Sequence, residues 1–178
     1  QCHGVGRGHL LDELVRAVAG QSASDSIQHY LLLGPRGIGK TTLLLMLYHR
    51  VKSEPVLAAR WLVVRYREEE YYAYSLRDLL ALALESLHRE EGVAEAEGIL
   101  DQVEAEGDDE RSLALALDGL RRIARASGKR ILLLIDNFDL VFLGSRSAEE
   151  DQRAFRKRLI TEAFLMVVGT STRQFDEI

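Results

Sequence analysis

The stretch Gly34-Pro35-Arg36-Gly37-Ile38-Gly39-Lys40-Thr41 decides the expected fold of this 178-residue chain. It fits the pattern G-x-x-x-x-G-K-[ST], in which glycines let the backbone turn sharply and present its N–H groups. A short apolar run at residues 29–33 precedes it and suits a buried parallel strand. Good helix formers at residues 41–52 follow it. A strand, this loop and a helix in that order predict a phosphate-binding loop, or P-loop.

The loop predicts a role for each of its positions. The helix that begins near Gly39 directs its positive end at the bound phosphate. Lys40 is expected to reach the β- and γ-phosphates, and Thr41 to offer its hydroxyl to Mg²⁺. The predicted nucleotide contacts in this region are Gly34, Pro35, Arg36, Gly37, Ile38, Gly39, Lys40, Thr41 and Thr42. The alternative is an ordinary glycine-rich turn, which does not require the lysine and threonine at these positions.

Length and composition predict one domain, residues 1–178, with a substantial core. Hydrophobic residues make up 47% of the chain, too many for a disordered segment. The net charge of −5 argues against direct DNA binding by the domain. One cysteine, Cys2, excludes a disulfide framework, and neither a signal peptide nor a membrane-spanning run is visible. We therefore expect a cytoplasmic protein that does not engage a membrane.

Apolar strands alternate with amphipathic helices, which predicts a three-layer α/β/α sandwich around a parallel sheet. The expected strands are residues 29–33, 61–67, 131–135 and 164–168. Arginines alternate with apolar residues at the end of the second strand, which is typical of a sheet edge. The third strand is the most apolar, and we expect it at the centre. Helices are expected after Ser75, which can cap the first of them, and over residues 113–124 and 149–161.

Two segments leave alternatives open. Residues 91–110 are acidic and poor in aromatic side chains, with a short helix expected around residues 94–106. They are interpreted either as a solvated helical insertion or as a surface that docks a partner. Residues 4–8 (GVGRG) are either a flexible lead-in or a segment whose glycines and Arg7 contact the adenine and ribose of a nucleotide.

Polar segments follow each predicted strand, at the sheet edge where α/β proteins bind their ligands. Glu68, Glu69 and Glu70 follow the second strand. Asp136 and Asn137 follow the third, and Thr170, Ser171 and Arg173 follow the fourth. An apolar strand that ends in Asp is the Walker B pattern. It assigns Asp136, together with Thr41, to Mg²⁺.

The P-loop, residues 131–137 (ILLLIDN) and residues 165–173 (LMVVGTSTR) together resemble the additional-strand P-loop ATPases, the AAA+ and STAND group. Within it the chain is most similar to the archaeal-type and origin-recognition-like ATPases. Residues 4–14 resemble the segment before the P-loop of that group, which implies that Val5 and Arg7 lie near the base. The resemblance also implies a sheet order of 5-1-4-3-2, and ATP or ADP with Mg²⁺ as ligands. Adenine specificity rests on it too, since no guanine-reading N-K-x-D motif appears.

The end of the fourth strand has two interpretations. Thr170 and Ser171 can meet the γ-phosphate or the attacking water through their hydroxyls, and the S-T-R ending resembles the T-T-R of STAND ATPases. In those proteins the arginine senses the γ-phosphate, which implies the same role for Arg173. The alternative is a polar turn that merely ends the strand.

Asn137 is a departure from the group, because many members have Glu directly after the Walker B Asp. An Asn side chain can orient water but cannot accept its proton, so we expect slow hydrolysis or a base from elsewhere. The candidates are Glu68, Glu69 and Glu70, with Asp139 as a weaker alternative. The three glutamates are otherwise a solvated charge run.

The resemblance implies a fifth strand, a helical lid and a second sensor, which we expect beyond Ile178, so the ATPase core is expected to be incomplete. No feature distinguishes a trans-acting arginine finger among Arg146, Arg153, Arg156 and Arg158. Self-association or protein partners are expected through further domains.

Three functions fit these observations. The first is an ATP-driven switch or assembly ATPase, favoured by the nearby glutamates. The second is a nucleotide-binding scaffold with negligible hydrolysis, favoured by Asn137. The third is a small-molecule kinase, which would need an arginine-bearing lid and an acceptor site that the sequence does not show.

Overall fold

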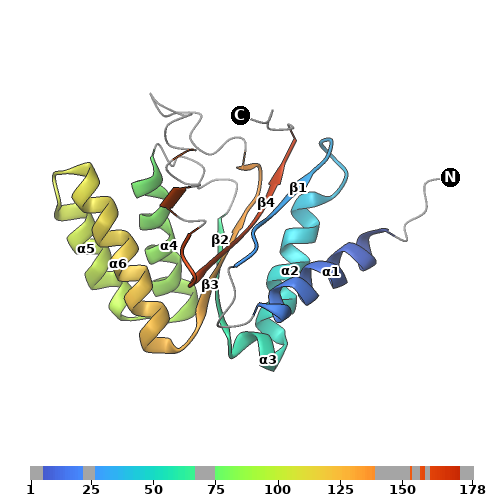
Figure 1. Ribbon diagram of the computed structural model, residues 1–178, viewed down its shortest axis with the longest axis horizontal. Coiled ribbons are helices and arrows are strands. Elements are labelled where there is room, and N and C mark those ends of the chain that lie inside the picture. The colour runs from blue at the N-terminus through green and yellow to red at the C-terminus, as the bar shows by residue number, and fades with distance from the viewer. Residues whose placement is uncertain are drawn as a thin grey trace.

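The computed structural model describes residues 6–21, 27–66, 75–138, 153, 157–158 and 161–172, with only the backbone described at residues 6 and 7. A central sheet separates two helical layers, and Figure 1 shows α1, α2 and α3 on one face and α4, α5 and α6 on the other. The helices are α1 (Gly6–Gly20), α2 (Lys40–Ser53), α3 (Pro55–Ala58), α4 (Leu76–Glu91), α5 (Glu95–Ala105) and α6 (Asp109–Ser127). The predicted α/β/α sandwich is confirmed.

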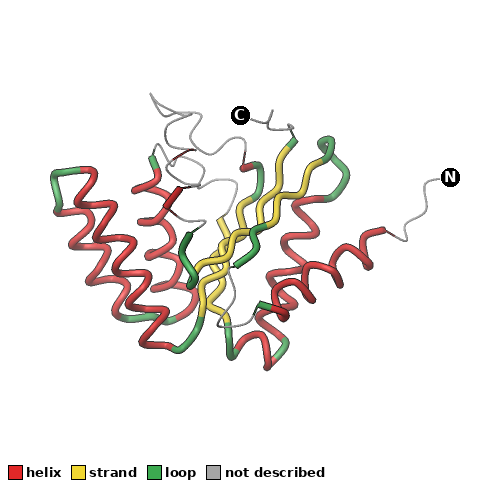
Figure 2. Tube along the Cα trace, in the orientation of Figure 1, coloured by secondary structure: helices red, strands yellow, loops and turns green. Residues whose placement is uncertain are grey.

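The four described strands are parallel and have the order β1-β4-β3-β2. They are β1 (Tyr30–Leu33), β2 (Trp61–Tyr66), β3 (Arg130–Ile135) and β4 (Leu165–Ser171). This order confirms the 1-4-3-2 part of the expected sheet, with β2 at one edge and β3 inside (Figure 2). Because all strands run the same way, the P-loop after β1 and Asp136 after β3 lie at the same edge of the sheet.

Alternate residues of the strands fill two cores, one on each face of the sheet. In β3, Ile131, Leu133 and Ile135 pack toward α4, α5 and α6. Leu132 and Leu134 pack toward α1, α2 and α3. All five are fully buried, which explains why this strand reads as a continuous apolar run.

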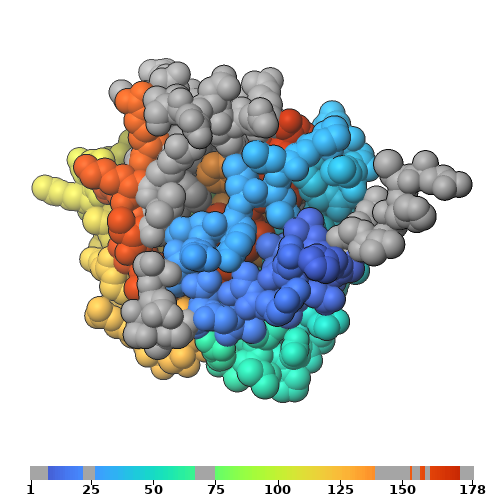
Figure 3. Space-filling view, turned by 45° about the vertical axis from the view of Figure 1, so that its right-hand side comes forward, coloured from blue at the N-terminus to red at the C-terminus, as the bar shows by residue number. Residues whose placement is uncertain are grey.

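β1 is less buried than its sequence predicts. Tyr30 and Leu32 pack on the core beneath α1 and α2, whereas Leu31 is 41% exposed and Leu33 is 51% exposed. In the described part of the chain β1 pairs only with β4, and the described helices on the opposite face lie over the other strands. Light-blue atoms of the segment that contains β1 are visible on the surface in Figure 3. The expectation of a strand buried on both faces is therefore wrong.

β4 is longer than predicted, since it continues beyond Val168 to Ser171. Its last residues pair with β1, with Leu32 opposite Thr170 and Leu33 opposite Ser171. Thr170 and Ser171 are consequently strand residues with no exposed surface, and the interpretation of a polar turn after Val168 is wrong for these two positions.

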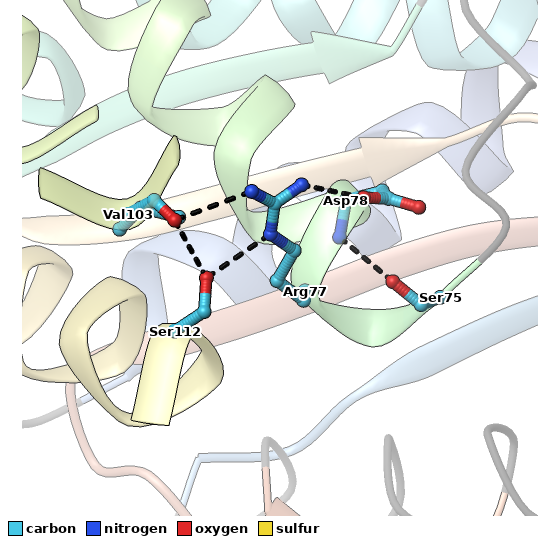
Figure 4. Close-up of polar contacts among 5 residues, drawn as sticks. All are labelled: Ser75, Arg77, Asp78, Val103 and Ser112. Carbon is cyan, nitrogen blue, oxygen red and sulfur yellow. Dashed lines mark hydrogen bonds and ion pairs between the residues drawn. The ribbon is translucent and has the colours of Figure 1, made fainter. Parts of the chain in front are cut away.

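The acidic stretch contains α5, which is packed rather than simply solvated. Ala96, Ile99 and Val103 of α5 are buried in the core shared with α4 and α6. Figure 4 shows how the three helices are joined: Arg77 of α4 donates to the Ser112 hydroxyl of α6 at 3.0 Å and to the Val103 carbonyl of α5 at 3.2 Å. Ser112 donates to the same carbonyl at 2.7 Å, and Asp78 pairs with Arg77 at 3.0 Å.

The helix ends follow sequence rules. Ser75 accepts a hydrogen bond from the Asp78 N–H at the start of α4, as predicted. Gly128 ends α6 with a φ of 66°, a left-handed conformation that glycine adopts without a steric penalty. α1 begins at Gly6, so the backbone of residues 6–8 is helical rather than a flexible lead-in. The predicted helix at residues 149–161 lies largely outside the described residues.

Candidate functional site

The P-loop connects the end of β1 to the start of α2. Gly37 has a φ of 83° and Gly39 a φ of 94°, conformations that side-chain-bearing residues rarely adopt. Gly39 precedes α2 and, because it has no side chain, does not cap the first turn of this helix. Its first N–H groups therefore remain able to bind an anion, because the terminal turn has no intrahelical partners for them. The intervening residues Pro35, Arg36, Gly37 and Ile38 are exposed.

Lys40 lies across the loop. Its ammonium group donates to the Gly34 carbonyl at 2.6 Å and to the Pro35 carbonyl at 2.9 Å. These bonds bring the positive charge over the loop, where the sequence predicts the phosphates. The lysine would exchange carbonyl partners for phosphate oxygens, which are stronger acceptors because they are charged.

Thr41 and Asp136 meet at the centre of the site. The Thr41 hydroxyl donates to Asp136 Oδ2 at 2.5 Å, although 95 residues separate them. Asp136 is only 7% exposed, and a buried carboxylate needs such donors to offset its desolvation. The first turn of the P-loop helix and the end of β3 therefore place a hydroxyl and a carboxylate together beside the loop.

Two further donors hold the other oxygen of Asp136. The Thr170 hydroxyl donates to Asp136 Oδ1, and the Asn137 N–H donates to the same oxygen at 3.1 Å. The Asn137 N–H also donates to the Thr170 hydroxyl oxygen at 2.9 Å. Asp136, Asn137 and Thr170 thus form a closed hydrogen-bonded group at the ends of two adjacent strands.

Asn137 has a φ of 45°, which makes it the only residue other than glycine with positive φ in the described part of the chain. Asn tolerates this left-handed conformation better than most residues because its short side chain can bond locally. The conformation turns the backbone immediately after β3, so that the Asn137 N–H faces back toward Asp136 and Thr170.

These oxygen donors fit a hard cation such as Mg²⁺. The pair offers one hydroxyl and one carboxylate, and the described residues contain no group of three or more His, Cys, Asp or Glu able to hold a metal. Mg²⁺ at nucleotide sites is commonly held by one or two protein oxygens together with phosphates and water. The donor set therefore suits a metal that arrives with a nucleotide better than an all-protein metal site.

Some of the predicted site residues lie close together in the structure, and others lie outside the described residues. Gly34, Lys40, Thr41 and Asp136 lie together, and the Gly34 N–H donates to the Ser171 carbonyl at 3.3 Å. Thr42 is exposed in the first turn of α2. The side chain of Arg7 and the residues Val5, Glu68, Glu69, Glu70, Asp139, Arg146, Arg156 and Arg173 lie outside the described residues.

Two features of the site were not predicted from the sequence. The contact between Thr170 and Asp136 was not expected, because the predicted strand ended before Thr170. For Asn137 a role was expected only of the side chain, whereas its backbone N–H donates to Asp136 and Thr170. The tolerance of Asn for positive φ is a signal that could have pointed to this turn.

A parallel sheet with a glycine loop between strand and helix, and a carboxylate beside that loop, defines a P-loop nucleotide-binding domain. Residues 4–168 match the AAA ATPase domain family, and the chain belongs to this family. The match confirms the ATP-binding class that the motifs predict. A search of curated proteins found no match.

Two solved structures have similar folds. Cdc6p from Pyrobaculum aerophilum is 14% identical with a TM-score of 0.58, and the match covers 97% of this chain and 40% of that one. The Aeropyrum pernix ORC2 protein, described in ADPNP–ADP complexes, is 17% identical with a TM-score of 0.57, with coverages of 96% and 42%. The chain thus spans about two fifths of their length. Within the described residues, no helix is both long and apolar enough to cross a membrane.

Proposed function

We propose that this domain binds ATP with Mg²⁺ and acts as a nucleotide-dependent switch or assembly ATPase with slow hydrolysis. The observation that carries the proposal is the contact between Thr41 and Asp136 at 2.5 Å beside the P-loop. Family membership and the nucleotide complexes described for the ORC2 protein support adenine nucleotides as the ligand. Further partners, including a second copy of the chain, belong to this proposal.

Each residue of the site would have a separate task. The P-loop N–H groups and the N-terminus of α2 bind the phosphates, and Lys40 leaves the Gly34 and Pro35 carbonyls to contact them. Thr41 and Asp136 would hold Mg²⁺, which offsets phosphate charge. Arg173 would contact the γ-phosphate as a permanently charged, two-pronged donor. Val5 and Arg7 would lie near the base.

Slow hydrolysis follows from the chemistry of Asn137, whose side chain cannot take a proton from water. We propose the cluster Glu68, Glu69 and Glu70 as the source of the base. These residues follow β2, whose last residue Tyr66 pairs with Ile135, the residue before Asp136. A scaffold that binds nucleotide with negligible hydrolysis is the alternative, and Asn137 is the observation that favours it.

A turnover assay combined with calorimetry separates these functions. The parent chain should bind ATP and, in the presence of Mg²⁺, release phosphate slowly but above the rate without protein. Changing all three glutamates to Gln should abolish release and leave ATP binding intact, because Gln has nearly the same size. Binding without turnover in the parent would favour the scaffold, and failure to bind ATP would contradict both functions.

A further inference from the structure

We propose that Thr170 is a positioning residue that fixes the Asp136 carboxylate for metal-bound nucleotide, rather than a contact to the γ-phosphate. The inference rests on the proposed function and deepens it. The two carboxylate oxygens of Asp136 accept from different donors. Oδ2 accepts from the Thr41 hydroxyl at 2.5 Å, whereas Oδ1 accepts from the Thr170 hydroxyl and from the Asn137 N–H.

The two oxygens of Asp136 therefore have different surroundings. Thr41 lies in the P-loop helix, on the side where the nucleotide would bind, so Oδ2 faces the ligand. Oδ1 faces the sheet, where its partners are the hydroxyl of Thr170 in β4 and the N–H of Asn137, which follows β3. A carboxylate rotates readily about its last bond, because that torsion has broad energy minima. Bonds at Oδ1 restrict this rotation and so set the direction of Oδ2.

The position of Thr170 and the orientation of its hydroxyl are fixed by its surroundings. It has no exposed surface, and it sits in the inner strand β4, opposite Leu32 of β1. Its β-branched side chain has few allowed rotamers, and its hydroxyl oxygen is fixed by the Asn137 N–H at 2.9 Å. The hydroxyl is thus oriented before any ligand arrives.

The same contacts weigh against a direct role at the γ-phosphate. A hydroxyl has one proton to donate, and Thr170 donates it to Asp136. To bond a phosphate oxygen, Thr170 would have to release Asp136, and the buried Oδ1 would keep only the Asn137 N–H as a donor among the described residues. Partners that orient metal-binding side chains typically change metal affinity about 10–100-fold when they are removed.

The test is a calorimetric comparison of ATP and ADP binding, each measured with excess Mg²⁺ and with excess EDTA. The variants are Thr170→Val, which keeps the shape but loses the hydroxyl, Thr170→Ser, which keeps the hydroxyl, and the parent. Thr170→Val should reduce the Mg²⁺-dependent gain in affinity about 10–100-fold for both nucleotides. Its affinity in EDTA should match that of the parent, and Thr170→Ser should retain most of the gain.

Other outcomes have separate meanings. An unchanged Mg²⁺-dependent gain, a loss for ATP alone, or an equal loss in EDTA would overturn the inference while leaving the proposed function intact. Absence of nucleotide binding by the parent would contradict the proposed function, and the inference with it. Urea unfolding checks each variant. If Thr170→Val does not fold, Thr170→Ala also removes the hydroxyl, without placing a methyl group against Asp136, and is judged by the same outcomes.

Discussion

The hydroxyl of Thr41 lies 2.5 Å from Oδ2 of Asp136, although β1 and β3, the strands that lead to these residues, are not neighbours in the sheet. β4 separates the two strands, and its residue Thr170 bonds the other oxygen of the same carboxylate. Three strands that are adjacent in space but distant in sequence thus converge on one carboxylate.

Two glycines in neighbouring helices should respond oppositely to alanine. A Cβ at Gly119 in α6 would lie 2.4 Å from Cγ2 of Ile99, whereas a Cβ at Gly98 in α5 meets nothing within 4 Å. Both substitutions gain helix propensity, but only Gly119→Ala also overpacks the core, at a cost of about 1–3 kcal/mol. In urea unfolding, Gly98→Ala should therefore have a higher free energy of unfolding than Gly119→Ala, by about 1–3 kcal/mol. Equal stabilities would show that α5 and α6 are not packed as described.

Arg77 should stabilise the three-helix layer. Its side chain is 27% exposed and bonds Ser112, the Val103 carbonyl and Asp78. Arg77→Ala should lower the free energy of unfolding by about 1.5–3 kcal/mol, the value of hydrogen bonds to charged groups. The matched control is Arg50→Ala, which removes an exposed pair with Glu54 at the end of α2 and should cost only about 0.3–0.5 kcal/mol. Similar losses for the two variants would contradict the bridging role of Arg77.

Replacing Asn137 with glycine should destabilise the protein less than replacing it with alanine. A φ of 45° destabilises the folded state by about 1 kcal/mol or more for a residue with a Cβ, unless local hydrogen bonds offset this strain. Glycine adopts the same conformation without strain. Chemical denaturation of Asn137→Gly and Asn137→Ala should therefore favour the glycine variant by about 1 kcal/mol. An alanine variant as stable as the glycine variant would mean that the backbone after β3 does not hold this conformation.

The isolated chain should bind duplex DNA only weakly at physiological salt. Non-specific DNA affinity comes mainly from neutralising phosphates with Lys and Arg, and this chain has a net charge of −5. Fluorescence anisotropy with a labelled duplex should give a dissociation constant above about 1 μM, within the range of non-specific binding. Tighter binding would reveal a local basic surface that the net charge conceals.

The framework was predictable because it depends on local patterns. The glycine spacing and Lys40 predicted the P-loop, and the apolar run of residues 131–135 predicted a fully buried inner strand. The amphipathic spacing from Leu113 to Ala124 likewise predicted a packed helix. Each of these signals reports a short-range periodicity or a fixed turn, which the sequence records directly.

The details that were missed depend on long-range pairing. β4 extends to Ser171 because its last residues pair with β1. Thr170 lies opposite Leu32, which is 138 residues earlier in the chain, and no local pattern encodes such a pairing. The same holds for the exposure of Leu33, which depends on what covers β1. The acidic segment seemed solvated because its charges outnumber its apolar residues, yet Ile99 and Val103 lie on one face of α5 and pack inward.

Calorimetric ATP binding by the parent, Lys40→Ala and Lys129→Ala tests the central claim most directly. Both variants lose one positive charge, but Lys129 precedes β3 at the opposite end of the sheet from Asp136. Lys40→Ala removes charge-assisted bonds of about 1.5–3 kcal/mol, so its affinity for ATP should fall about 10–150-fold, with the fold retained. Lys129→Ala should bind ATP like the parent. Equal affinities for all three proteins, or an equal loss in both variants, would contradict the assignment of this loop to nucleotide.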